Sequence, residues 1–220
     1  MRKFWLLLAV VLLGTVSAFA GPVDFTFLGF TDGNWQIGYP YYITGGPASS
    51  VIAVMCDDYI HGGAVGDTWE ANITDLGSNN VSLTRFGHQE SALGLAMYRE
   101  AGWILLETVT TPMGQWMDMN EAVWHIFDPA APIDSGGMGW LAAAGQEAKL
   151  GYPGVDFNKV YIITPVNQYN PDPNSIQEFM YIGNDPTSSS SSPAGTTPEP
   201  GTLVLLGTGA LTLLRRKFLS

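Results

Sequence analysis

The spacing of apolar residues changes twice along the middle of the chain. From Val23 to Thr74, apolar and polar residues alternate or apolar residues form short runs, and both patterns are typical of β-strands. From Gln89 to Lys149 the apolar residues recur every three or four positions, as on one face of a helix. Two more apolar runs follow. This order predicts an α+β fold, a β-rich domain with a central helical block of about three helices.

The predicted strands are short and are separated by segments rich in glycine, proline and asparagine. They are Val23–Phe30, Trp35–Ile43, Val51–Cys56 and Thr68–Thr74 before the helical block, and Val160–Thr164 and Ile176–Ile182 after it. Within this set, Val51–Cys56 is an almost unbroken apolar run, which predicts a strand that is buried on both faces.

The predicted helices are Gln89–Glu107, Gln115–Phe127 and Trp140–Lys149. In the first of them, Leu93, Met97 and Ile104 have helical spacing and are expected to face the core. Asp128 precedes a proline, which disfavours helical geometry in the residue before it, so the second helix should end there. Gly151 should end the third helix.

The first twenty residues have the organisation of a signal peptide. Met1-Arg2-Lys3 is basic, Phe4–Val16 is apolar, and Ala18-Phe19-Ala20 has the small-x-small form of a signal peptidase site. Signal peptidase should cut after Ala20 and leave Gly21 as the first residue. The alternative is an uncleaved signal anchor, which the shortness of the apolar segment disfavours. The sequence therefore predicts export across the inner membrane.

The last part of the chain combines three features in a defined order. Pro198-Glu199-Pro200 is followed by Gly201–Leu214, fourteen residues without a charge, and then by Arg215-Arg216-Lys217. As a helix the uncharged segment would span about 21 Å, which is short of a hydrocarbon core of about 30 Å. The basic cluster should stay on the cytoplasmic side by the positive-inside rule, so the chain before it is exported. Pro186–Pro198, with five successive serines, is typical of a flexible tether.

This order resembles the PEP-CTERM sorting tail, which is also labelled the ice-binding protein C-terminal domain. The resemblance implies recognition by an exosortase-type membrane protease near Pro198, Glu199 and Pro200. It also implies that the C-terminal helix anchors the protein in the membrane only transiently. The protein is then released to the cell envelope, the surface or the extracellular space. The alternative is an ordinary C-terminal anchor that is never cut. The predicted organisation is a signal peptide (1–20), an exported α+β domain (21–185), a Ser/Pro-rich tether (186–198) and a sorting tail (199–220).

Without these end segments the chain is strongly acidic. Five of the nine Lys and Arg residues lie in the end segments, but only one of the twenty Asp and Glu residues does, so the body carries nineteen acids against four bases. This charge disfavours an anionic lipid surface as a partner, and no nucleic-acid partner is expected. Solubility outside the cell is the simplest use of the charge, and attraction of cations or basic partners is the alternative.

Cys56 is the only cysteine, so the chain cannot form an internal disulfide. It ends an apolar strand, and about sixty residues later Ala122-Val123-Trp124 lies on a predicted helix. These two segments resemble the halves of the thioester domain of surface adhesins, in which a strand cysteine is bonded to a glutamine four residues before the tryptophan. In this chain the glutamine position is Asn120, whose side chain is one methylene shorter. The resemblance therefore implies a degenerate thioester pair, Cys56 and Asn120, in which the thiol is free.

Other residues that could carry chemistry have weaker patterns. His61 and His125 are candidate bases for a cysteine nucleophile, but no local signature of a cysteine hydrolase surrounds the cysteine. Asp57-Asp58 with Asp67 or Glu70 could hold calcium, yet the twelve-residue calcium-loop pattern is missing. The three histidines are too scattered for a zinc-ligand spacing. We therefore expect no metal and no cofactor.

Together these features indicate a non-enzymatic binding or structural module of the cell surface or extracellular matrix, with an exopolysaccharide or another surface ligand as the candidate partner. Two alternatives stay open. One is a covalent adhesin with an internal thioester at Cys56. The other is a secreted hydrolase that uses acidic side chains, although no paired-carboxylate motif nominates them.

Both ends of the chain should be absent from the mature protein. We expect a chain that starts at Gly21 and lacks Arg215–Lys217, because signal peptidase and the exosortase-type protease each remove one segment. Mass spectrometry of the terminal peptides, on protein recovered from the cell envelope, measures both ends. Recovery of the intact tail as the dominant form would instead indicate a simple membrane anchor.

Overall fold

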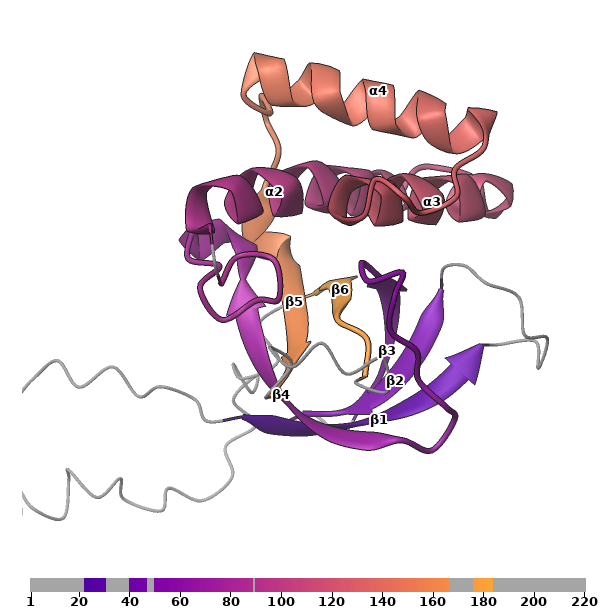
Figure 1. The fold of residues 1–220 in the computed structure, drawn as a ribbon, viewed down its shortest axis with the longest axis vertical. Coiled ribbons are helices and arrows are strands. Elements are labelled where there is room, and N and C mark those ends of the chain that lie inside the picture. Colours follow the sequence, from indigo (N-terminus) through magenta and orange to yellow (C-terminus); the bar gives the residue numbers. More distant parts are fainter. Residues whose placement is uncertain (1–21, 31–39, 47–49, 89, 167–175, 184–220) are drawn as a thin grey trace, which may run out of the picture. The chain divides into compact units, whose positions relative to one another are not determined.

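The computed structural model describes residues 22–30, 40–46, 50–88, 90–166 and 176–183. Six strands in these residues form a closed barrel in the order β1-β2-β3-β6-β5-β4, and all neighbouring strands are antiparallel (Figure 1). The strands are β1 (Val23–Phe30), β2 (Tyr41–Gly45), β3 (Ser50–Cys56), β4 (Thr68–Asp75), β5 (Val160–Pro165) and β6 (Phe179–Ile182).

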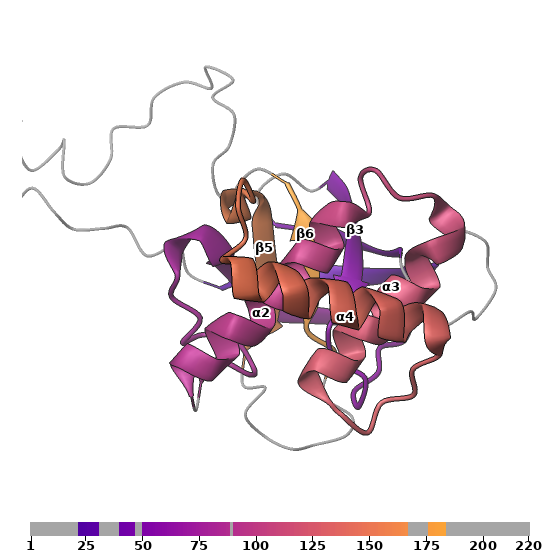
Figure 2. The same cartoon turned by 90° about the horizontal axis from the view of Figure 1, so that it is seen from above.

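Three α-helices lie between β4 and β5 in the sequence and form a layer outside the barrel. They are α2 (Ser91–Glu107), α3 (Trp116–Phe127) and α4 (Ser135–Leu150). α2 and α3 lie next to the barrel (Figure 1), and α4 lies across both of them on the side away from the strands (Figure 2). This arrangement confirms the α+β prediction for the body. The predicted signal peptide and C-terminal apolar helix lie outside the described residues.

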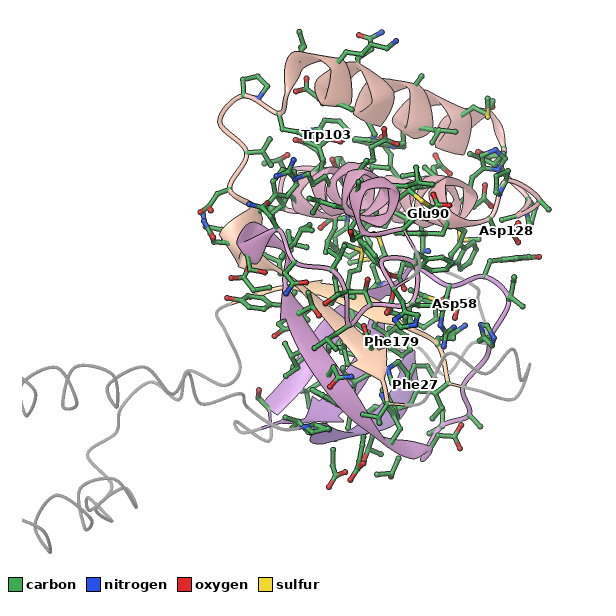
Figure 3. The ribbon with its side chains drawn as sticks, turned by 60° about the vertical axis from the view of Figure 1, so that its left-hand side comes forward. Phe27, Asp58, Glu90, Trp103, Asp128 and Phe179 are labelled. Carbon is green, nitrogen blue, oxygen red and sulfur yellow. The ribbon has the colours of Figure 1, made fainter. Side chains whose placement is uncertain are left out.

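The alternation of side chains along the strands divides the buried residues into two cores. On β3, Cys56 belongs to the core inside the barrel, whereas Met55 belongs to the core between the barrel and the helices. Phe179 and Met180 on β6 divide in the same way. The rings of Phe27 and Phe179 stack inside the barrel with their centroids 5.9 Å apart (Figure 3).

The strand predictions in the described residues are confirmed, with shifts of up to three residues at their ends. The predicted burial of the third strand is wrong. β3 is fully buried only over Val54–Cys56, whereas Val51 is 62% exposed. Met55 is the residue of β3 that belongs to the core between the barrel and the helices. The beginning of the strand is not covered by this core and is exposed to solvent. Of the predicted strand Trp35–Ile43, residues 35–39 lie outside the described residues.

The ends of α3 and α4 agree with the predictions. α3 ends at Phe127, and Asp128 before the proline has extended backbone angles of φ −132° and ψ 99°. α4 ends at Leu150, and its C-cap residue Gly151 has a left-handed conformation with φ 74°. Such a conformation favours glycine because it has no Cβ.

The beginning of α4 differs from the prediction, because the helix starts at Ser135 and not at Trp140. The side chain of Asp134 accepts a hydrogen bond of 2.9 Å from the backbone N–H of Gly137. This N-cap stabilises a first helical turn that is rich in glycine, so local capping outweighs the low helix propensity of these residues.

Of the three residues of α2 predicted to face the core, Ile104 is buried and Met97 packs against the core, but the prediction for Leu93 is wrong. Leu93 is 56% exposed, whereas Tyr98 and Ile104 are fully buried. Gly94 is buried next to Gly87, and a Cβ added at Gly94 would lie 2.5 Å from the Cα of Gly87. The close backbone approach at Gly94 places this residue on the inner face of α2 and leaves Leu93 on the outer face.

Among the helices of the described residues, none is long and apolar enough to cross a membrane. The segment Gly201–Leu214 lies outside the described residues.

The close approach at Gly94 predicts opposite effects of two glycine substitutions. Gly94→Ala should lower the free energy of unfolding by about 1–3 kcal/mol, because the added methyl group meets the backbone of Phe86 and Gly87. Gly145→Ala in α4 is the matched control, because nothing lies within 4 Å of a Cβ added there. It should raise the free energy of unfolding by about 0.5–1 kcal/mol through helix propensity. Urea unfolding followed by circular dichroism measures both, and equal effects would contradict the close approach.

Candidate functional site

Cys56 is a free cysteine at the end of β3 and is fully buried in the barrel core. Its Sγ donates a hydrogen bond of 3.1 Å to the carbonyl oxygen of Asp58, and the backbone N–H of Asp58 donates to the sulfur at 3.4 Å. Burial raises the pKa of the thiol, the charge of Asp57 raises it further, and the neighbouring indole of Trp124 acts in the opposite direction. The nucleophilic thiolate is therefore disfavoured.

The side chain of Asn120 links α3 to β3. Its Nδ2 donates a hydrogen bond of 2.9 Å to the carbonyl oxygen of Cys56, and the whole residue is buried. Among the described residues its Oδ1 has no hydrogen-bond partner. Loss of the donor would leave a buried carbonyl oxygen unsatisfied, at a cost of about 1–3 kcal/mol. The structure thus brings the two residues of the predicted pair together through a contact between the amide nitrogen and the backbone oxygen.

Trp124 lies one helical turn after Asn120 and enters the same core as Cys56. It is 3% exposed, and Tyr59 packs against it with the ring centroids 5.4 Å apart. Tyr59 itself is 41% exposed, so it forms the solvent side of this contact. Two aromatic side chains therefore separate this part of the core from solvent.

Asp58 organises the loop that leaves β3 (Figure 3). Its buried carboxylate forms an ion pair with Arg85 and lies 2.7 Å from the Nδ1 of His61. Its Oδ1 also accepts the backbone N–H groups of Ile60 and His61 at 3.2 and 3.3 Å. Arg85 in turn donates to the carbonyl oxygen of Ile176 at 2.9 Å. Through Arg85, Asp58 therefore links its loop to the segment before β6. Removal of one partner of the ion pair would leave a buried charge uncompensated, at a cost of about 3–5 kcal/mol.

Glu178 is a second buried acid beside the same strand end. It accepts hydrogen bonds from the hydroxyl of Tyr98, from the hydroxyl of Thr164 at 2.5 Å and from the backbone N–H of Arg85 at 2.9 Å. These three donors come from α2, from β5 and from the loop before α2. Asp57 is also fully buried, and within the described part of the chain neither of its carboxyl oxygens has a partner at hydrogen-bond geometry.

The weaker candidates of the sequence do not converge on one site. Asp58 forms the ion pair with the arginine, whereas Asp67 accepts the backbone N–H of Ala64 at 2.7 Å. The candidate base His61 lies against Asp58, and the Nδ1 of His125 lies 3.1 Å from a backbone carbonyl oxygen. In the residues that the structure describes, no group of three or more His, Cys, Asp or Glu side chains could hold a metal ion.

Sequence reasoning missed the roles of Arg85, Tyr98 and Glu178. Glu178 lies 93 positions after Arg85 and 80 positions after Tyr98, so no local motif in the sequence predicts these contacts. The one local signal is Glu178 itself, because a charged residue that interrupts the apolar run of a predicted strand needs partners if the strand is buried.

A family model, the PEP-CTERM protein-sorting motif, matches residues 196–217. The chain carries a PEP-CTERM sorting motif. The motif implies an exported protein that an exosortase-type protease processes and that attaches to the cell envelope or surface. The match includes Pro198, Glu199 and Pro200 and the basic cluster Arg215–Lys217, as predicted, although these residues lie outside the described part of the structure.

Among solved structures, the chain is similar to the N-terminal thioester domain of a surface protein from Clostridium perfringens. The two share 12% sequence identity, with a TM-score of 0.41, over 74% of this chain and 98% of that chain. A TM-score at this level does not establish a shared fold, so the case for Cys56 and Asn120 rests on their own contacts. None of the curated proteins matches the chain.

Proposed function

We propose that the body is a non-enzymatic binding or structural module of the cell surface or extracellular matrix, in which Cys56 and Asn120 form a non-covalent clamp. The observation that supports this best is the hydrogen bond from the Nδ2 of Asn120 to the carbonyl oxygen of Cys56. The clamp joins α3 to the end of β3. The sorting motif supplies the destination, and an exopolysaccharide or another surface ligand is the partner that this destination favours.

Three features favour the clamp over a thioester between the same residues. The nitrogen of Asn120 acts as a hydrogen-bond donor, whereas a thioester would form only with its loss as ammonia. The thiol of Cys56 donates to the carbonyl oxygen of Asp58 and is held as a thiol by its raised pKa. The asparagine carbonyl carbon also lies one carbon–carbon bond, about 1.5 Å, closer to its own backbone than that of a glutamine.

A covalent adhesin with a thioester at Cys56 is the second candidate. In its favour, the Oδ1 of Asn120, which a thioester would retain, has no hydrogen-bond partner among the described residues. The indole N–H of Trp124 also has no hydrogen-bond partner among the described residues. The bond would form by attack of the cysteine Sγ on the Asn120 Cγ, and the ammonia that leaves would take up the thiol proton.

A secreted hydrolase would need acidic side chains that meet a substrate. The acids that lie together near the end of β3, Asp57, Asp58 and Glu178, are at most 2% exposed. Their burial favours a structural role for these three side chains.

The clamp predicts a free thiol in the native protein. Intact mass spectrometry of the mature chain should show no deficit of one ammonia, and a thiol reagent should label Cys56 slowly until the chain is unfolded. Asn120→Ala should lower the free energy of unfolding by about 1–3 kcal/mol, because the buried carbonyl oxygen of Cys56 loses its donor.

Asn120→Gln and Cys56→Ala are the informative controls. An ammonia deficit that appears only in Asn120→Gln would show that the shorter side chain is what prevents the bond. A deficit in the unmodified protein that disappears in Cys56→Ala would contradict the clamp and make covalent adhesion the function.

A further inference from the structure

Two buried carboxyl groups, those of Asp57 and Glu178, lie where β3 ends and β6 begins. The register of these strands pairs Met55 with Met180 and Cys56 with Phe179, so Asp57 and Glu178 are the next pair. The backbone N–H of Asp57 donates to the carbonyl oxygen of Glu178 at 3.5 Å, a long hydrogen bond. Side chains that are paired across two strands lie within about 4.5–5.5 Å of each other at their Cβ atoms. Both acids have no exposed surface.

Arg85 is the positively charged residue of the described part of the chain that acts on Asp57. Arg85 forms its ion pair with Asp58, although its backbone N–H donates to Glu178. Glu178 therefore has three donors, counting the hydroxyls of Tyr98 and Thr164, as a buried carboxylate requires.

Asp57 has none of these donors. Glu178 raises the pKa of Asp57 through the negative charge of its carboxylate and as an acceptor of the Asp57 proton. The distance or angle between the two carboxyl groups nevertheless falls outside hydrogen-bond geometry. Burial is the largest cause of the raised pKa, and Arg85 acts in the opposite direction. Two adjacent buried carboxyl groups cannot both ionise without a large cost in free energy.

We propose that Asp57 and Glu178 hold one proton between them, as a carboxylic acid and a carboxylate, and that this shared proton locks the end of β3 to β6. The proposal goes beyond the clamp, because it concerns a different contact of the same strand end. When the proton passes to solvent at higher pH, two anions face each other across the long hydrogen bond. The strands then separate at this point, and the loop that begins at Asp58 loses its support.

Other titratable groups surround Asp57, and they contribute to the pH dependence. On β3, burial and Asp57 raise the pKa of Cys56, and on α2, burial, Glu178 and Asp57 raise the pKa of Tyr98. The loop groups Asp58 and His61 form the network with Arg85. From α3, the polar side chain bonded to this strand end is an asparagine amide, which does not titrate. A comparison at a single position, with all these groups unchanged, isolates Asp57.

The sign of the effect follows from the direction of the pKa shift of Asp57. An acid whose pKa is higher in the folded protein keeps its proton there while the unfolded chain releases it. The contribution of Asp57 to stability is therefore most favourable below the ordinary Asp pKa of about 4 and becomes less favourable as the pH rises toward the folded pKa of Asp57. Asparagine at this position has nearly the same shape and no charge, so Asp57→Asn should remove this pH-dependent loss of stability.

The test compares the melting temperature of the full mature protein with that of Asp57→Asn between pH 4.5 and pH 9. We expect nearly equal values at pH 4.5 and a variant that melts higher by at least about 2–4 °C at neutral and alkaline pH. Asp24→Asn, at an exposed acid in β1, is the matched control and should show no such growth with pH. A pH-independent effect of Asp57→Asn, or one that decreases with pH, would overturn the proposal.

A second measurement does not depend on the variant folding. The carboxyl carbon-13 resonance of Asp57, recorded by NMR in the unmodified protein at pH 7, should report a protonated acid. Hydrogen exchange at residues 57–61, corrected for intrinsic rates, should accelerate when that resonance titrates. An ionised Asp57 at pH 7, or exchange that does not follow its titration, would overturn the shared-proton lock.

Discussion

The hydrogen bond from the Asn120 side chain to the carbonyl oxygen of Cys56 joins the helical layer to the end of the barrel. It fixes the position of α3 against β3, and the next helical turn then places Trp124 in the barrel core. The same contact buries the cysteine, because the strand end that bears it is covered by the helix and by the loop that follows. The buried thiol and the tryptophan therefore both lie in the barrel core next to this polar contact.

A second set of polar contacts holds the same region from the other side. Asp58 pairs with Arg85, and Glu178 collects donors from three segments that are distant in the sequence. Buried polar groups are costly unless they are hydrogen-bonded, so this network specifies one arrangement of barrel, loop and helices rather than adding to the apolar driving force. Asp57 remains without a donor and is the least satisfied acid among those described in this region.

Local patterns in the sequence predicted most of the secondary structure, since periodicity and breakers act over a few residues. The residue before Pro129 ended α3, and Gly151 ended α4, as expected from backbone sterics. The closure of six strands into a barrel was not predictable in this way, because it pairs β1 with β4 and β3 with β6 across long separations. The face that α2 buries also depended on a tertiary contact, the approach of Gly94 to Gly87.

The candidate site also contains features that local sequence patterns indicate and features that depend on contacts between distant segments. The resemblance of two short segments nominated Cys56 and Asn120 as a pair, and in the structure the side chain of Asn120 hydrogen-bonds the backbone of Cys56. The kind of contact was not predictable from the residue types, because it depends on how far α3 lies from the strand end. The acid network was missed because the partners of Glu178 come from segments 80 and 93 positions away, so its place in a strand pattern signals a need for partners but does not identify them.

Solution NMR of the mature protein, labelled with nitrogen-15 and carbon-13, tests the non-covalent clamp most directly. The account predicts a side-chain NH₂ pair for Asn120, with one slowly exchanging proton and a scalar coupling through the hydrogen bond to the carbonyl carbon of Cys56. The pair is assigned by its loss in a variant without the amide. A folded protein in which Asn120 shows no side-chain NH₂ pair, or only a rapidly exchanging one without this coupling, would contradict the clamp.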